Sequence, residues 1–246
     1  MKYSPVLLST LLLASFSAHT ALAQETAERR KRHYTAQARP YYRGPVRFTL
    51  GAGVGLYNGD LAENLTNNLP GPSISLGALY MMRPHLVVGG EFTYFQLGAK
   101  DQIPERGIAF QGRNESLVGF IRYEFLHDEG EFAGARSPAA LIKPYLKAGA
   151  GFLLYNPKSY RGTDRPLPTT EYLPPEVNDY PAMALVAPVG LGLVFRLTPQ
   201  INATAEAAYY FTSTDRLDDV SQRGNPSLKD GYGLVELKLE YAPWGR

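Results

Sequence analysis

Apolar and polar residues alternate along much of this chain, and the clearest example is the segment from residue 201 to residue 211. One set of alternate positions there holds Ile, Ala and aromatic residues, and the other set includes Asn202, Thr204 and Glu206. Because successive side chains of a β-strand point to opposite faces, this pattern predicts a strand with one apolar and one polar face. Strand after strand of this kind is typical of a β-barrel in a membrane.

Seven further segments share this alternation, some with glycines on one face. The eight predicted strands are residues 46–57, 73–82, 85–97, 114–125, 142–155, 183–197, 201–211 and 232–241. Residues 77–84 and 192–199 follow the same plan, which places Glu91 and Glu206 on the same face of their strands. Long loops alternate with shorter turns, as in outer-membrane barrels with both chain ends in the periplasm. The predicted fold is all-β: an eight-stranded antiparallel transmembrane β-barrel, an OmpA-like up-and-down meander.

The chain begins with the pattern of a secretory signal peptide over residues 1–23. Lys2 supplies a positive charge, a short apolar run follows, and Ala21-Leu22-Ala23 fits the small-residue cleavage rule. Residues 24–45 are predicted to be a flexible periplasmic tail, and residues 46–246 the barrel domain. The basic cluster Arg29 to Arg32 is either solvated or in contact with anionic lipid or a protein partner.

The composition narrows the classes of partner. The chain has no cysteine, which excludes a disulfide framework, a lipid anchor on cysteine and thiolate chemistry. Its formal net charge is only +2, and it shows no basic helix or basic-aromatic motif, so nucleic acid is not expected to bind. We expect outer-membrane lipids to be the partners of the barrel wall and the outer membrane to be its location.

Charged residues occupy many of the positions predicted to face the lumen: Glu91, Arg122, Lys147, Arg196, Glu206, Glu236, Lys238 and Glu240. A buried charge is costly unless it is paired, so these residues are expected to form a structural salt-bridge network. An ion or proton path is the functional alternative. It is disfavoured because the interior of an eight-stranded barrel is just wide enough for side chains to fill.

Candidate catalytic and metal residues are few. One histidine lies in the signal peptide and one in the tail, while His85 and His127 flank predicted turns, so no hydrolase site at the membrane rim is expected. Asp215, Asp218 and Asp219 in the last loop could hold calcium, but they lack an ordered ligand spacing. Solvated carboxylates or turn caps are favoured there. We therefore expect no enzyme activity, no metal and no cofactor.

Two short motifs carry a resemblance to a known family. Residues 53–61 read Gly-Val-Gly-Leu-Tyr-Asn-Gly-Asp-Leu and resemble the end of the first strand in an outer-membrane barrel family of Bacteroidetes-type envelopes. Residues 214–221 resemble the last extracellular loop of that family, with Arg216 where an aromatic residue is usual. Residues 113–117 and 144–151 also fit. This family of unknown function is similar to PorG, an outer-membrane component of the type IX secretion system.

The resemblance covers about residues 46–241 and implies eight strands, outer-membrane residence and a role beside the secretion ring. It transfers no catalytic residue. The motif residues singled out are Tyr57, Gly59, Asp60, Asp215, Asp218 and Asp219. Gly59 is expected to provide a turn with positive φ, and Asp60 and Asp218 to cap loop backbone.

The expected function is a structural or protein-interaction role in the envelope. The resemblance implies an accessory role in type IX protein secretion, with secretion-machinery proteins as the expected partners on the periplasmic side. The alternative is an adhesion or recognition barrel that acts through residues 156–181 and 212–231, whose Tyr, Pro and Arg content suits protein contacts. A soluble lipid-carrying barrel is disfavoured because it would need an apolar interior.

Overall fold

The computed structural model describes residues 31–59, 65–101, 107–126, 128–134, 139–162, 164–175, 180–219 and 229–243. The predicted signal peptide, residues 24–30, Asp60 and His127 lie outside these described residues. Within the described ranges, no helix combines the length and apolar character needed to cross a membrane.

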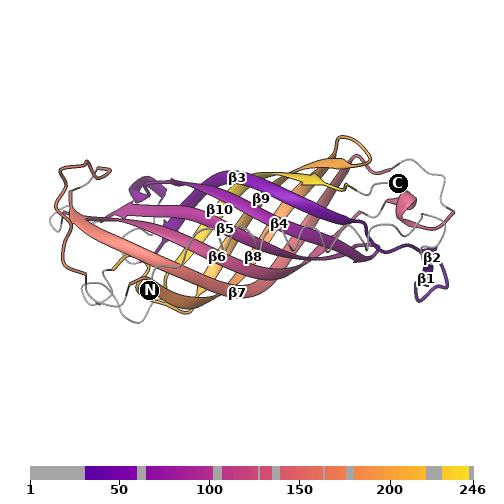
Figure 1. Cartoon of the computed structure of the whole chain (residues 1–246), viewed down its shortest axis with the longest axis horizontal. Helices are drawn as coiled ribbons and strands as arrows, with labels where there is room; N and C mark the ends of the chain where they lie inside the picture. Colours follow the sequence, from indigo (N-terminus) through magenta and orange to yellow (C-terminus); the bar gives the residue numbers. More distant parts are fainter. Residues whose placement is uncertain are drawn as a thin grey trace, which may run out of the picture.

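Eight strands form one closed antiparallel barrel (Figure 1). They are β3 (Val46–Asn58), β4 (Gly71–Arg83), β5 (Leu86–Lys100), β6 (Ile108–Glu124), β7 (Ile142–Arg161), β8 (Ala182–Arg196), β9 (Ile201–Thr212) and β10 (Gly231–Tyr241). Each strand pairs with its neighbours in sequence, and β10 pairs with β3 to close the barrel. The predicted eight-stranded meander is thus confirmed. We call the end with the short connections β4–β5 and β8–β9 the turn end, and the opposite end the loop end.

Three strands reach further toward the loop end than their sequence pattern predicts. Residues 98–100 of β5 pair with residues 109–111 of β6, and residues 108–113 of β6 pair with residues 156–161 of β7. Glycines and Pro157 interrupt the apolar alternation in these segments, so they read as loop. Cross-strand pairing on neighbouring strands extends the sheet there despite the weak local pattern. Residues 187–188 of β8 have no partner on β7, which agrees with the lack of an amide hydrogen in Pro188.

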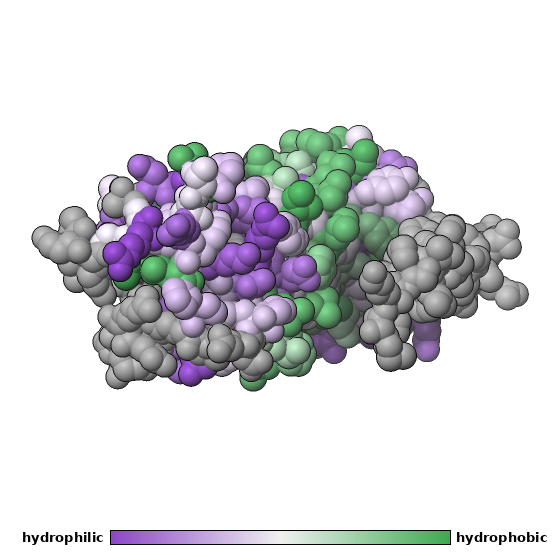
Figure 2. Space-filling model, turned by 60° about the vertical axis from the view of Figure 1, so that its left-hand side comes forward, coloured by the Kyte–Doolittle hydropathy of each residue, from purple (hydrophilic) through white to green (hydrophobic). Residues whose placement is uncertain are grey.

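The outer wall of the barrel is apolar. Leucines on different strands are more than half exposed, including Leu50 on β3, Leu117 on β6 and Leu237 on β10. Figure 2 shows a hydrophobic band across the visible face of the barrel, with hydrophilic residues beside it toward the loop end. Alternate residues on the same strands are buried in the lumen and include charged side chains such as Glu236. An apolar exterior around a polar interior is the arrangement of a transmembrane barrel.

The lumen has two layers. Toward the loop end it is filled by aromatic and aliphatic side chains, in which the ring of Tyr232 stacks on Phe95 and on Tyr210 with 4.6 Å between each pair of ring centroids. Toward the turn end it is filled by charged side chains. Ion pairs and packed rings together fill most of the interior, as expected for a barrel of this width.

Residues 31–45 are the described part of the predicted tail. This part contains the short strands β1 (His33–Tyr34) and β2 (Pro40–Tyr41), which pair with each other. They contact the β6–β7 connection, which includes the 3₁₀ turn η3 (Glu129–Glu131): Arg39 forms an ion pair with Glu129, and Tyr41 pairs with Phe132. Arg39 and Glu129 are 90 residues apart in the sequence, so a local pattern does not reveal their contact. A second 3₁₀ turn, η2 (Leu65–Asn67), lies in the β3–β4 loop.

Candidate functional site

A central cluster of five charged side chains lies at mid-lumen. Lys147 of β7 reaches Glu91 and Glu206, with distances from its Nζ of 3.1 Å and 2.8 Å. Lys238 of β10 reaches the same two carboxylates at 2.5 Å and 2.8 Å, and Glu236 at 3.2 Å. All five side chains are buried. The carboxylates come from β5, β9 and β10, so this cluster ties together strands on different sides of the barrel.

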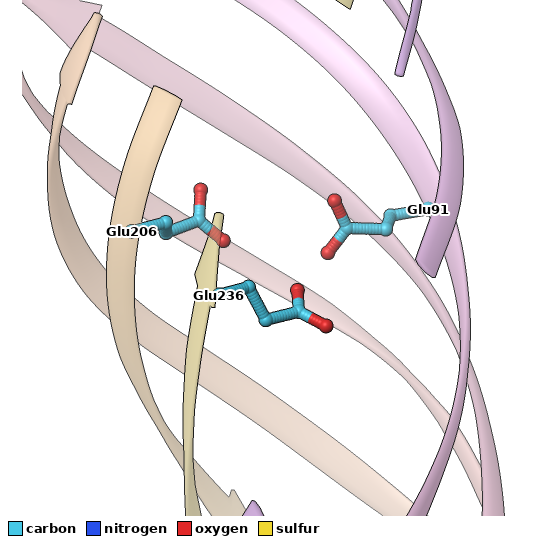
Figure 3. A group of neighbouring side chains, drawn as sticks. All are labelled: Glu91, Glu206 and Glu236. Atoms are coloured by element: carbon cyan, nitrogen blue, oxygen red, sulfur yellow. The ribbon is translucent and has the colours of Figure 1, made fainter. Parts of the chain in front are cut away.

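The three carboxylates of the central cluster converge, as Figure 3 shows. One oxygen from each of Glu91, Glu206 and Glu236 lies within 4.8 Å of the others, close enough to ligate one metal ion. In this barrel two lysine ammonium groups already contact these oxygens and neutralise most of their charge. The arrangement therefore acts as an ion-pair network.

A second cluster lies one layer nearer the turn end. The guanidinium of Arg122 donates from Nη1 to Glu240 at 2.6 Å and from Nη2 to Glu124 at 2.5 Å. Glu240 also accepts hydrogen bonds from Asn202 at 3.0 Å and from Thr204 at 2.9 Å. Extra hydrogen bonds to the carboxylate oxygens help to offset the cost of burying an ion pair, and Glu240 has two of them here.

Tyr145 connects the two clusters. Its hydroxyl donates to Oε2 of Glu206 at 2.6 Å, and the guanidinium carbon of Arg122 lies 4.7 Å from the centre of its ring. The ring has room because Gly192 lies beside it on β8: a Cβ atom there would come within 2.4 Å of the ring. Tyr145 was not among the sequence-predicted site residues, because a tyrosine in a membrane strand more often marks an interface.

The structure brings seven of the eight predicted lumen residues into these two clusters and places Arg196 elsewhere. Arg196 is the last residue of β8 and forms an ion pair with Asp128 of the β6–β7 connection at the turn end. Because Arg196 is at the end of its strand, its side chain reaches the connection at the turn end. It therefore does not join the lumen network, although its place in the alternation predicts an inward side chain. Glu124, which is not among the eight predicted residues, joins the network through its ion pairs with Arg122 and Lys143.

A cavity of about 290 Å³ opens at the turn end, and we call it the mouth cavity. Gly44 and Pro45 of the amino-terminal segment line one part of it, and Gly130 and Glu131 of the β6–β7 connection line another. The remaining charged lining residues are Arg47, Arg122, Glu124, Asp128, Lys143 and Arg196. The cavity thus lies between the charged layer of the lumen and the segments that contact the turn end.

A cluster of acidic residues lies at the loop end. The hydroxyl of Tyr57 lies 2.7 Å from Oδ1 of Asp230 and 2.8 Å from Oδ2 of Asp218, and both carboxyl groups are buried. A tyrosine hydroxyl has one hydrogen, so both contacts are hydrogen bonds only when one of the two carboxyl groups is protonated. Burial, with a further contribution from the Asp218 carboxylate, raises the pKa of Asp230 to about 8. The pair therefore holds a proton near neutral pH.

The motif residues of the family resemblance partly meet in this loop-end cluster. Asp219 accepts a hydrogen bond from Ser159 at 3.2 Å, and Asp218 contacts Tyr57 as described above. The prediction of a positive φ at Gly59 is wrong, because Gly59 is not among the residues with positive φ. Gly59 is needed for space instead: a Cβ atom there would come within 2.0 Å of Asp230 and 2.2 Å of the Tyr57 hydroxyl. Sequence reasoning missed Asp230, which lies just before the last strand.

His85 lies in the β4–β5 turn, where its Nδ1 is 2.6 Å from the backbone oxygen of Glu124. Its ring stacks on Tyr123, with 5.7 Å between ring centroids. His85 therefore lies at a turn, as predicted, and contacts the backbone of the neighbouring strand.

No protein-family model and no curated protein matches this chain. Among solved structures, neisserial surface protein A is similar with a TM-score of 0.48 and 14% identity, over 81% of this chain and 98% of that one. The attachment invasion locus protein Ail of Yersinia pestis, in complex with the heparin analogue sucrose octasulfate, gives 0.43 and 15%, over 80% and 96%. A major outer membrane protein from Thermus thermophilus gives 0.42 and 12%, over 80% and 99%. Similarities this low transfer no function.

Proposed function

We propose that this chain is an integral outer-membrane β-barrel with a structural or protein-interaction role in the envelope. The observation that carries the proposal is the contrast between an apolar outer wall and a lumen filled by ion pairs and aromatic rings. An apolar outer wall suits a bilayer, and closed barrels with such a wall and a polar interior are typical of outer membranes. Because side chains fill the lumen, the role we propose is non-catalytic and is exerted at the two ends of the barrel.

The turn end offers a surface for a periplasmic partner. The hairpin of β1 and β2 projects beyond the barrel (Figure 1), and Tyr34 on it is 64% exposed. Arg39 lies over the ring of Phe132, 3.9 Å from its centroid, and so fixes the hairpin to the β6–β7 connection. A fixed surface with an exposed tyrosine suits protein contacts. The finer proposal, which rests on the motif resemblance, is that this surface docks on a component of type IX secretion.

The test compares the extracellular proteins of a deletion strain with those of strains that carry the restored gene. One restored gene encodes the full chain and another lacks residues 31–43, with folding of both barrels checked by their heat-dependent mobility on gels. Selective loss of secreted cargo that only the full chain restores is the expected result. Unchanged secretion in the deletion strain would contradict the secretion role. The proposal that the chain is an outer-membrane barrel does not depend on that result.

The second candidate is an adhesion or recognition barrel, which the extension of β5, β6 and β7 at the loop end favours. This extension presents exposed basic residues, Lys158 and Arg161, on β7, with Lys158 5.6 Å from the ring centre of the exposed Tyr172. Replacing Lys158 and Arg161 by Ser is expected to reduce the attachment of the bacterial cells to the surface that the barrel recognises, without affecting secretion. Equal attachment of both strains would exclude this role for the extension.

A further inference from the structure

We propose that the mouth cavity at the turn end binds a phosphate group, with Arg47 as its hydrogen-bond donor and Glu131 as its acceptor. The inference concerns a ligand site and is independent of the partner proposed for the barrel. It follows from the ion pairs around the cavity and from the polar atoms that these pairs leave unmatched. Arg122 Nε is one of these atoms, and the other two, Arg47 Nη1 and Glu131 Oε2, define the hydrogen bonds that a ligand would have to make.

The ion pairs of the cavity account for every charged lining residue except Arg47. Arg122 binds Glu124 and Glu240, Lys143 binds Glu124 and Glu131, and Arg196 binds Asp128. Among the described residues, Arg47 has no carboxylate within salt-bridge distance and its Nη1 is buried with no hydrogen-bond partner. A partly buried guanidinium without a direct ion-pair partner is costly, so an anion in the cavity would offset that cost.

Glu131 supplies the second unmatched group. Its Oε1 binds Lys143 at 3.1 Å, while its Oε2 has no hydrogen-bond partner among the described residues. A carboxylate oxygen accepts hydrogen bonds and cannot donate one. A ligand that satisfies both unmatched atoms must therefore accept from Arg47 and also donate to Glu131.

Phosphate meets both requirements. In its mono- and dihydrogen forms it carries oxygens that accept from a guanidinium and a P–OH group that donates to a carboxylate, and Arg is well suited to bind it. Sulfate and phosphate diesters carry no such hydrogen, so their oxygens would face the Glu131 oxygen without a proton between them. The cavity volume of about 290 Å³ leaves space for a phosphate with part of the molecule that carries it. Free phosphate and a phosphomonoester are both compatible sources.

The test is calorimetric titration of the folded barrel in detergent with inorganic phosphate, sulfate and dimethyl phosphate at neutral pH. Saturable binding of phosphate, at least about tenfold tighter than that of sulfate or dimethyl phosphate, is expected because hydrogen bonds to charged groups are strong. A phosphomonoester such as glycerol phosphate then separates the two sources: tighter binding than inorganic phosphate identifies an esterified ligand. Equal binding of sulfate and phosphate would overturn the proposal.

Two variants locate the site. Arg47→Gln is expected to weaken phosphate binding at least about tenfold. Glu131→Gln is expected to remove the preference for phosphate over sulfate, since an amide can donate to either anion. Arg113→Gln, on an exposed arginine of β6 toward the loop end, is the control and should leave binding unchanged. Phosphate binding that survives Arg47→Gln would also overturn the proposal, and Glu131→Gln keeps the test informative if the Arg47 variant fails to fold.

Discussion

The ammonium groups of Lys147 and Lys238 share one carboxylate oxygen, Oε1 of Glu206, at 2.8 Å each. The lysines lie on β7 and β10, and Glu206 lies on β9. Each lysine also reaches Glu91 on β5. The hydrogen bonds of the sheet join neighbouring strands only, whereas the two lysines, through Glu206 and Glu91, join strands that are not neighbours in the barrel.

Glu206→Gln should strongly destabilise the barrel. The amide keeps the size of the side chain but removes the charge that both lysines share, and loss of one partner from a buried ion pair typically costs about 3–5 kcal/mol. The measurement is the free energy of unfolding in urea, in which the gel mobility of the folded barrel reports the folded fraction. Glu171→Gln, an exposed carboxylate in the β7–β8 loop, is the control. A variant as stable as the parent chain would refute the network as a stabilising element.

Tyr145→Phe tests the link between the two charged clusters. The change keeps the ring against Arg122 and removes the hydroxyl that donates to Glu206 at 2.6 Å. A hydrogen bond to a charged group is worth about 1.5–3 kcal/mol, and we expect a loss of that size in the free energy of unfolding. The same urea titration measures it. Tyr172→Phe, on an exposed tyrosine, should change nothing, and a similar loss in both variants would contradict a specific role for Tyr145.

The alternation of residues predicts which side chains face the lumen but not which of them meet. Glu91 and Glu206 face inward as their shared phase predicts. Their common partners depend on how the strands are staggered around the barrel, and that stagger follows from the full set of strand pairings. The same limit explains Arg196: its phase indicates the inner face, while its place at the end of β8 puts it beside Asp128.

Features that depend on distant segments were beyond the reach of sequence patterns. The contact of Arg39 with Glu129 joins the amino-terminal segment to a connection that follows four barrel strands. The space around Gly59 is likewise set by Asp230, from the opposite end of the barrel sequence. Glycine in a loop motif suggests a positive φ on local grounds, and only the closed barrel reveals that the missing Cβ is what matters.

Two glycine substitutions should distinguish the lumen face from the lipid face. Gly192→Ala places a Cβ within 2.4 Å of the ring of Tyr145, which is buried and held by Glu206. Overpacking of this kind typically costs about 1–3 kcal/mol, and we expect that loss in the free energy of unfolding. Gly119→Ala is the matched change on the outer face, where the nearest heavy atom is 4.0 Å away, and it should be neutral. The prediction fails if both variants unfold at the same urea concentration.

The acidic pair at the loop end should make stability depend on pH. Because burial and Asp218 raise the pKa of Asp230 to about 8, the folded chain binds more protons than the unfolded chain between that value and the ordinary value of 3.8. Raising the pH through this window therefore lowers the free energy of unfolding, by at most about 1.4 kcal/mol per pH unit. Above pH 8 the stabilising contribution of the proton on Asp230 is lost.

Asp230→Asn isolates this effect, because the amide can hydrogen-bond to Tyr57 and does not titrate. The measurement is the free energy of unfolding of both chains from pH 5 to pH 9. We expect the parent chain to lose stability relative to the variant as the pH rises, with the difference constant above about pH 8. The amide of Leu217, which donates to Asp230 at 2.9 Å, gives a local reading by hydrogen exchange corrected for intrinsic rate. A stability difference that does not change with pH would mean that Tyr57, Asp218 and Asp230 hold no shared proton.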